Sequence, residues 1–248
     1  MSLLFIILVA SAPSMGLMTY FYWRDRYERE PLHHVVAAYL LGMYSMIAAQ
    51  GIAFWAADVV PQLWLEPRTE FTRLFDAFVL SGSVEEISKF VVLAAAVYHW
   101  DEFDERLDGL VYGVAIALGF ATLENFIYLQ KYGLAIAWQR AVFAVPAHAL
   151  FGGTMGYYLG KVKFPKPGRP LIPWINRGLA LGLPVLFHGL YNYALGHRLD
   201  WKIWAAVVLL SVGFWLFVLR RVYRAQRASP YRPRTIAPFV HSDPGRKR

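Results

Sequence analysis

Three ionisable residues, Glu85, Glu86 and Lys89, lie inside a stretch that is otherwise apolar. On a helix, successive residues turn by about 100°, so Lys89 lies angularly between the two carboxylates, and its i, i+4 spacing from Glu85 favours an ion pair. One lysine can neutralise one glutamate and leave the other free. Such a free carboxylate has the chemistry of a general base or a metal ligand. The alternative is a buried ion pair with a purely structural role.

Further polar residues occur in three other apolar stretches: Glu124 beside Asn125, His148, and His188 with Asn192. His188 and Asn192 are one helical turn apart, so together they could hold a water molecule and stabilise an oxyanion. Taken singly, each group is equally typical of a hydrogen bond between two packed helices. Their chemistry therefore depends on whether the fold brings them together.

The composition indicates that these stretches lie in a membrane. Of the 248 residues, 57% are hydrophobic and 17% charged, and the mean hydropathy is +0.37, which excludes an ordinary soluble protein. Nine Trp, fifteen Tyr and seventeen Phe exclude a disordered chain. With no Cys, the chain has no disulfide, no thiol nucleophile and no zinc–thiolate site.

Seven apolar stretches are long enough to cross a hydrocarbon core of about 30 Å as helices. They run over residues 3–22, 34–56, 74–98, 107–129, 136–160, 178–195 and 201–219. Ala10-Ser11-Ala12 resembles a signal-peptide cleavage site, but no basic segment precedes it and the apolar run continues beyond it. We predict an all-α, polytopic transmembrane bundle of about seven spans in the cell membrane.

The distribution of charge predicts the orientation. The net charge is +8, and residues 220–248 hold nine Lys and Arg against one acidic residue. Across alternate connections, Lys and Arg number eighteen on one side and five on the other, which places the N-terminus outside and the C-terminus in the cytoplasm. We therefore divide the chain into a membrane domain, 1–219, and a basic tail, 220–248, that faces anionic lipids rather than nucleic acid.

The charged groups within the expected spans are costly, at about 2.5–3.5 kcal/mol each near a helix centre, so they should be paired. Arg140 shares a span with His148. Counted from the outer ends of their spans at about 1.5 Å per residue, Glu85, Glu124, His148 and His188 lie roughly 8–18 Å deep. Four polar groups at overlapping depth predict one shared, water-filled cavity.

The motifs in this region resemble those of the PrsW family of intramembrane proteases. They are Glu85-Glu86-Ile87-Ser88-Lys89, Phe120-Ala121-Thr122-Leu123-Glu124-Asn125, Pro146-Ala147-His148 and His188-Gly189-Leu190-Tyr191-Asn192. Asp108-Gly109-Leu110-Val111-Tyr112-Gly113 is also similar to that family. The resemblance covers about residues 71–193, the motif core of the membrane domain.

The PrsW family is related to the CAAX prenyl endopeptidase and bacteriocin-immunity superfamily, from whose pattern this chain departs at two places. Lys89 followed by Phe90 stands where that superfamily has an arginine, and Glu124 replaces a histidine. Both departures favour the PrsW branch and argue against prenylated substrates.

The resemblance implies an intramembrane endopeptidase that cleaves a membrane protein, such as a single-span anti-sigma factor, near the extracytoplasmic side of the bilayer. It assigns Glu85 as general base, with Glu86 and Lys89 supporting it. His148 and His188 bind a metal or stabilise the oxyanion, assisted by Asn192. Glu124 is either the third metal ligand or a partner that shares a proton. Three ligands and a water would suit zinc, while a metal-free glutamate and histidine mechanism fits the resemblance equally.

Two other functions are compatible with membrane-embedded Glu, Lys and His residues. A proton- or ion-coupled transporter could use them as a relay, although the chain shows no inverted repeat and its polar groups cluster in one half of the bilayer. An inactive protein with a protease fold is disfavoured because every motif residue is present.

Overall fold

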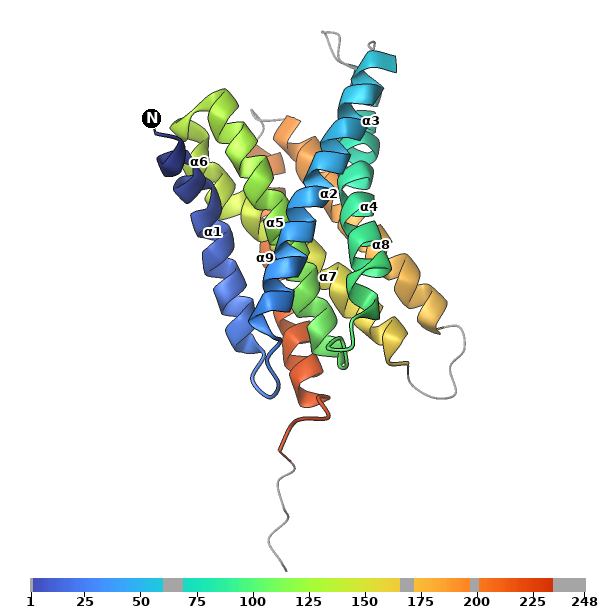
Figure 1. The fold of residues 1–248 in the computed structure, drawn as a ribbon. Helices are drawn as coiled ribbons and strands as arrows, with labels where there is room; N and C mark the ends of the chain where they lie inside the picture. Colours follow the sequence, from blue (N-terminus) through green and yellow to red (C-terminus); the bar gives the residue numbers. More distant parts are fainter. Residues whose placement is uncertain (1, 60–68, 166–171, 197–200, 234–248) are drawn as a thin grey trace, which may run out of the picture.

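The computed structural model describes residues 2–59, 69–165, 172–196 and 201–233, and the regular structure in these ranges is helical, without a strand (Figure 1). Each expected apolar stretch forms helix. The longer elements are α1 (Leu3–Arg24), α2 (Leu32–Val59), α4 (Val84–Ala95), α5 (Arg106–Tyr132), α7 (Val145–Lys163), α8 (Ile172–Gly196) and α9 (Trp201–Arg227). The short elements are α3 (Glu70–Phe75), η2 (Asp76–Ser83), η3 (Val97–His99), η4 (Leu134–Ile136), α6 (Ala137–Gln139) and η5 (Arg140–Ala144). The all-α prediction is confirmed for the described residues.

Five of the seven expected spans are long and apolar enough, by length and composition, to cross a membrane. They are α1, α2, α5, the run Leu134–Lys163 and α9. The other two, the run from α3 to α4 and α8, form helices but do not meet the same standard. These two carry Glu85, Glu86 and Lys89, and His188 and Asn192, respectively, whose polarity lowers their hydropathy.

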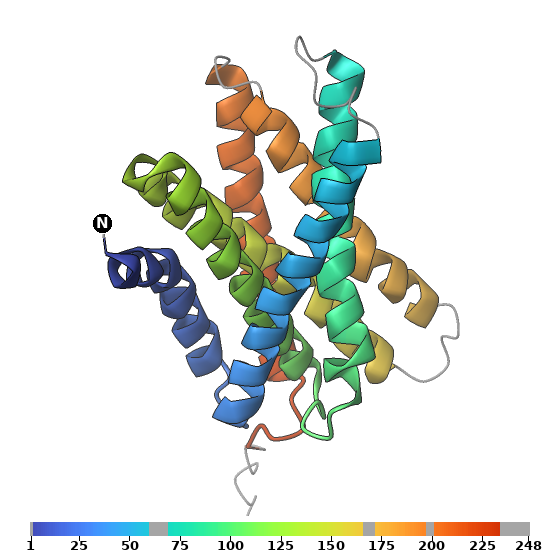
Figure 2. The ribbon, with the colours of Figure 1, turned by 45° about the horizontal axis from the view of Figure 1, so that its top comes forward.

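Helix α5 forms the centre of the bundle and packs against α7, α2 and α1; in Figures 1 and 2, α2 crosses it obliquely. Contact between α5 and α7 is unusually close because both helices present glycines. A Cβ at Gly113 would lie 2.2 Å from the carbonyl oxygen of Gly152, and one at Gly156 would lie 1.6 Å from that of Gly109. The close approach expected from the glycines after His148 is therefore present.

Replacing Gly156 by alanine tests this packing. The added methyl group meets backbone, which cannot rotate away, so α5 and α7 must separate. We expect Gly156→Ala to lower the free energy of unfolding by at least about 1–3 kcal/mol, measured by thermal unfolding in detergent. Gly182→Ala is the matched control, because nothing lies within 4 Å of a Cβ there. Equal stability of the two variants would contradict the packing.

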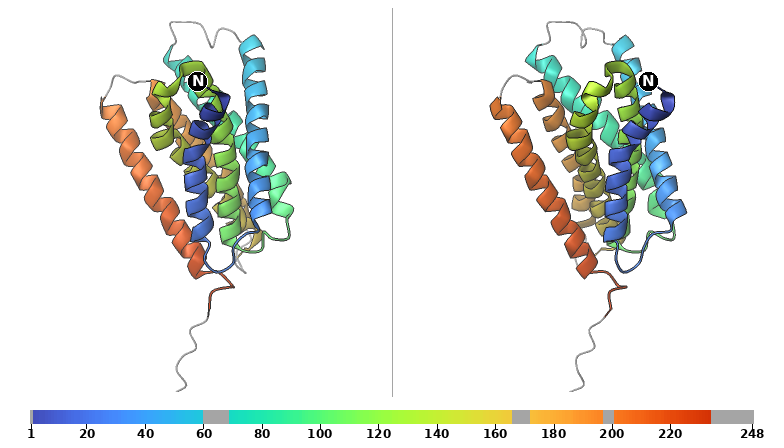
Figure 3. Two further views of the ribbon diagram at one scale, coloured as in Figure 1. Left: turned by 60° about the vertical axis from the view of Figure 1, so that its left-hand side comes forward. Right: turned by 90° about the vertical axis from the view of Figure 1, so that its left-hand side faces the viewer.

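The start of α1 and the end of α9 lie at opposite ends of the bundle (Figures 1 and 3). We call the end at which α9 finishes the tail end. The ends of other helices meet there. Arg106 donates a hydrogen bond to the carbonyl of Phe164, and Lys163 donates hydrogen bonds to the carbonyls of Tyr98 and Trp100. Chain ends at opposite ends of the bundle are consistent with an odd number of membrane crossings. Which side of the membrane each end faces stays a prediction.

Helix α9 continues to Arg227, eight residues beyond the predicted span end at Leu219. The remaining tail, 234–248, and Arg68, Lys166, Arg169 and Arg198, which entered the charge count, lie outside the described residues. Helix α9 runs obliquely along one side of the bundle (Figure 3), burying Phe214, Val218 and Val222, whereas Leu209 and Leu210 in its first half are exposed.

Two π-helical segments precede predicted site residues in the chain. Segment η2 spans Asp76–Ser83 and leads into Glu85 and Glu86, and η5 spans Arg140–Ala144 and leads into His148. A π-helix is wider than an α-helix and is frequently found at functional sites. Segment η2 packs against α8, where a Cβ at Gly82 would lie 3.1 Å from the backbone nitrogen of Gly189. This contact sets α4 beside His188.

Candidate active site

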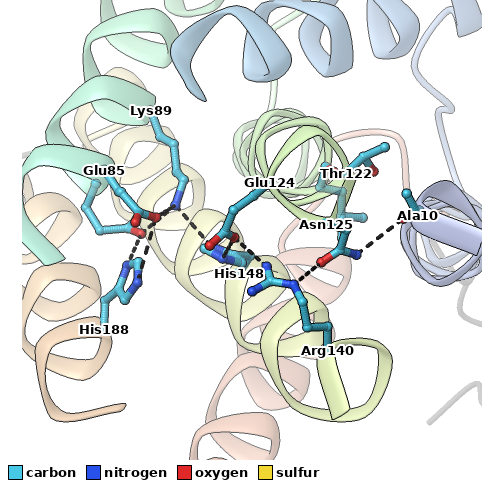
Figure 4. Close-up of polar contacts among 11 residues, drawn as sticks. Ala10, Glu85, Lys89, Thr122, Glu124, Asn125, Arg140, His148 and His188 are labelled. Atoms are coloured by element: carbon cyan, nitrogen blue, oxygen red, sulfur yellow. Dashed lines mark hydrogen bonds and ion pairs between the residues drawn. The ribbon is translucent and has the colours of Figure 1, made fainter. Parts of the chain in front are cut away.

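Four helices bring six of the predicted site residues into one cluster (Figure 4). Helix α4 supplies Glu85, Glu86 and Lys89, α5 supplies Glu124, α7 supplies His148 and α8 supplies His188. The rings of the two histidines lie 5.3 Å apart, nearly perpendicular. The convergence expected from their depth in the spans is thus present in the structure.

Glu86 is the carboxylate with the most partners. Its Oε1 accepts hydrogen bonds from Lys89 Nζ at 2.7 Å and from His188 Nδ1 at 2.8 Å, and the Glu86 side chain is fully buried. Because Nδ1 of His188 faces a carboxylate, Nδ1 carries a proton and donates it. When the ring holds that proton alone, Nε2 keeps its lone pair. Glu86 therefore orients His188 with its basic nitrogen toward the other residues of the cluster.

Glu85 is the carboxylate with the longer contacts. Its Oε2 has no hydrogen-bond partner among the described residues and lies 3.7 Å from Lys89 Nζ and 3.8 Å from His188 Nε2. Its side chain is 19% exposed, against 0% for Glu86. Lys89 therefore contacts both carboxylates, and Glu85 is the one held only by long ion pairs.

His148 joins the two halves of the cluster. Its Nδ1 lies 3.0 Å from Lys89 Nζ and its Nε2 lies 3.0 Å from Glu124 Oε2. An ammonium only donates, so Nδ1 of His148 accepts and the proton is on Nε2, which donates to Glu124. Glu124 also pairs with Arg140 at 2.6 Å. All of these groups thus belong to one continuous network.

Arg140 is a residue of the cluster whose role could not be predicted from the sequence. Besides its pair with Glu124, it donates to Asn125 Oδ1 and stacks on the Tyr128 ring at 4.1 Å. Asn125 in turn donates to the carbonyl of Ala10, which connects the network to α1 (Figure 4). One feature of the sequence could have indicated this role: an arginine inside a membrane span is energetically costly and therefore requires an acidic partner.

The cluster faces a polar cavity of about 350 Å³. Glu85, Glu124, His148 and His188 line it, and so does Asn192, which is present at the site but makes no hydrogen bond to His188. At about 30 Å³ per water, this volume has room for several molecules. Ile136 and Gly196 also line the cavity, so it extends toward the end of the bundle opposite the tail end.

An apolar groove leads from this cavity to the lipid-facing side of the bundle. Ala147, Phe151 and Tyr191 line both the polar cavity and an adjoining apolar pocket. That pocket shares Phe187, Leu210 and Phe214 with a wider groove between α8 and α9. A path with apolar walls thus runs from between two membrane helices to the polar cluster.

The three atoms best placed to hold a metal come from Glu85, His148 and His188, and they lie within 4.8 Å of one another. The sequence pointed to Glu124 as the carboxylate ligand instead. In the structure Glu124 is held on the far side of His148 by Arg140, whereas Glu85 faces Nε2 of His188. The geometry therefore replaces Glu124 by Glu85 in the ligand set.

A multi-helix membrane bundle with carboxylates and histidines around a buried polar cavity defines a membrane-embedded protein with a potential hydrolytic centre. The sequence matches the profile of the PrsW family, described as "PrsW family intramembrane metalloprotease", over residues 30–220. The chain belongs to this family and is a multi-pass protein of the cell membrane.

Similar curated proteins carry the name Protease PrsW. The protein of Bacillus subtilis is 35% identical over 89% of this chain and 95% of its own length. The protein of Geobacillus kaustophilus is 35% identical over 92% of the chain and 94% of its own, and that of Clostridioides difficile is 33% identical over 83% of both. No solved structure shows a significant match.

Proposed function

We propose that this protein is an endopeptidase that hydrolyses a peptide bond of a membrane protein within the bilayer. The observation that carries the proposal is the free carboxylate of Glu85 at the wall of a polar cavity, opposite the basic nitrogen of His188. Hydrolysis needs a group that takes a proton from water next to groups that stabilise an oxyanion. Family membership supports a peptidase rather than another hydrolase.

In a metal-free reaction, Glu85 would take the proton from the attacking water. Glu86 holds His188 through Nδ1, and Lys89 offsets the charge of Glu86 and donates to His148. His188 and Asn192, both at the cavity wall, are positioned to stabilise the oxyanion once His188 carries a second proton. Lys89 and Glu86 therefore position the residues that react.

The family description implies a metal ion, and the residues present fit one. Oε2 of Glu85, which has no hydrogen-bond partner among the described residues, lies 3.8 Å from His188 Nε2. His148 would complete the set only by exchanging one of its ring contacts, to Lys89 or to Glu124, for the ion. A Glu, His, His set with an open fourth position is typical of catalytic zinc. When bound, zinc supplies a Lewis acid that activates water and polarises a carbonyl. Glu85 would then be a ligand, and Glu124 would be the cavity carboxylate left to accept the proton.

Metal analysis of purified variants separates the two ligand sets. If Glu85 is the ligand, Glu85→Gln removes zinc from the protein and Glu124→Gln retains it, because Glu124 is bonded to Arg140 and lies outside the compact set. The measurement is the molar ratio of zinc to protein by inductively coupled plasma mass spectrometry. His188→Ala is the positive control for loss. Zinc lost from Glu124→Gln but kept by Glu85→Gln would contradict this assignment.

The apolar groove between α8 and α9 supports a substrate that arrives from the bilayer. A membrane-spanning segment is apolar along its length, so it can lie against Leu183, Phe217 and the other apolar residues of the groove. Its end would then enter the polar cavity, which extends toward the end opposite the basic tail. A single-span protein such as an anti-sigma factor, cut near the extracytoplasmic boundary, has this form.

Reconstitution in proteoliposomes with a single-span candidate substrate tests the function. We expect two substrate fragments, with the cut within a few residues of one membrane boundary, as determined by mass spectrometry. The transporter alternative predicts instead that protons or ions cross the vesicle membrane while the substrate stays intact. Proton flux without any cleavage would overturn the proposal.

A further inference from the structure

A second cluster of ionisable groups lies at the tail end, well away from the candidate active site. Asp25 follows α1, Glu30 precedes α2, and Asp108 is in the first turn of α5. Sixteen residues of α5 separate Asp108 from Glu124, which corresponds to about 24 Å at about 1.5 Å per residue. The catalytic proposal makes no use of these carboxylates.

The three side chains are closed off from solvent and turned toward one another. Asp25 and Asp108 are 0% exposed and Glu30 is 1% exposed. One carboxylate oxygen from each lies within 4.8 Å of the others. No Lys, Arg or His nitrogen of the described residues forms an ion pair with them, although a buried carboxylate without a partner is expensive.

The protein holds one oxygen of two of these carboxylates and leaves the other free. Glu30 Oε2 accepts from the Tyr112 hydroxyl, and Asp108 Oδ2 accepts from the backbone nitrogens of Asp104 and Glu105. The second oxygens, Oε1 of Glu30 and Oδ1 of Asp108, receive no hydrogen bond from another residue in the described part of the chain, and the two carboxyl groups lie within hydrogen-bond reach of each other. Carboxylates fixed by one oxygen with the other unused are typical of metal ligands.

Asp25 is an independent indication that something is bound. It is fully buried, and neither of its oxygens has a hydrogen-bond partner among the described residues. Among the described residues, Lys163 interacts electrostatically with Asp108 but forms no ion pair with the three carboxylates, so a cation from solution could act as their counter-ion.

We propose that Asp25, Glu30 and Asp108 bind a hard divalent cation, Ca²⁺ or Mg²⁺. Both ions prefer oxygen ligands, and the cluster offers no sulfur or nitrogen. Two oxygens on opposite sides of one Ca²⁺ are about 4.6–5.2 Å apart, twice the usual ligand distance of about 2.3–2.6 Å, and the observed separations fall within that limit. The ion joins the α1–α2 connection to the start of α5.

Neighbouring contacts indicate what the ion stabilises. Gln226 near the end of α9 donates to the carbonyl of Arg24, next to Asp25, and Tyr231 donates to Asp104, which itself donates to Asp108. The site therefore lies where α1, α2, α5 and α9 meet. Binding there holds the two N-terminal helices and the end of α9 onto the central helix.

The test uses full-length protein in detergent, stripped with a chelator and dialysed. Equilibrium dialysis with ⁴⁵Ca²⁺ should show one ion per chain for wild type and none for Asp25→Asn. At a concentration about 100-fold above the Kd, Ca²⁺ or Mg²⁺ should raise the unfolding temperature of wild type by about 5–10 °C. Asp25→Asn should lose this shift, while Asp101→Asn, an exposed carboxylate of the same region, should keep it.

Two further arms keep the outcome decisive. The double variant Glu85→Gln/His188→Ala, which lacks the candidate catalytic ligands, should bind and respond as wild type does, so the result is independent of the proposed function. Sodium chloride at matched ionic strength should give no shift. The proposal is overturned if wild type binds no ion in dialysis, if sodium chloride reproduces the shift, or if Asp25→Asn without ions is more stable than wild type with them.

Discussion

Glu85→Gln is expected to abolish cleavage while leaving the fold intact. The amide keeps the size of the side chain but cannot take a proton from water, and general acid–base catalysis contributes about 10²–10⁴-fold to such reactions. Stability should hardly change, because Glu85 Oε2 makes no hydrogen bond to the described residues and its ion pairs are long. The measurement is the rate of substrate cleavage in proteoliposomes, together with the unfolding temperature.

Two matched variants define what this result means. Glu102→Gln changes a partly exposed glutamate at the tail end, outside the site cluster, and should cleave at the wild-type rate. Glu86→Gln should lose both activity and stability, since Glu86 holds Lys89 and His188. Wild-type cleavage by Glu85→Gln would remove Glu85 from the reaction, and equal unfolding temperatures for Glu85→Gln and Glu86→Gln would contradict the division of roles between them.

The helices could be predicted from hydropathy, but their internal irregularities could not. Every apolar stretch forms a helix because apolar side chains are compatible with the lipid interior and a helix pairs all backbone N–H and C=O groups within the segment. The π-helical segments before Glu85 and His148 could not be predicted from the apolar composition of their stretches. The two stretches that miss the standard for a span carry Glu85, Glu86 and Lys89 in one and His188 and Asn192 in the other, and these polar residues lower their hydropathy.

Part of the site could be predicted from the spacing of residues on one helix and from the depth of polar residues within their spans. Lys89 between two glutamates follows from helical geometry, and the meeting of His148 with His188 follows from their similar depth. The pairing of Glu124 with Arg140 depends on how α5 packs beside η5, which the sequence does not reveal. The same holds for Asp25 and Asp108, which are far apart in sequence and come together only through the packing of α1 against α5.

Lys89→Met is expected to be the most destabilising single substitution in the site. Lys89 is fully buried, pairs with Glu86 at 2.7 Å and with His148 Nδ1 at 3.0 Å, and lies 3.9 Å above the Phe120 ring. Methionine fills the space but removes the charge, which leaves Glu86 ionised and buried without a cation other than a histidine. Breaking a buried pair in this way costs about 3–5 kcal/mol, measurable as the free energy of unfolding in mixed micelles.

A second substitution shows whether that cost comes from the charge that remains. In Glu86→Gln/Lys89→Met both charges are gone, and the amide of the glutamine can still accept from His188. The double variant should therefore recover most of the lost stability, because the penalty of one unpaired buried charge disappears with its partner. Lys131→Met, at an exposed position near the end of α5, should be neutral. If the double variant is less stable than Lys89→Met, the lysine acts through packing on Phe120 rather than through Glu86, and Glu86 is not the charge that Lys89 is there to balance.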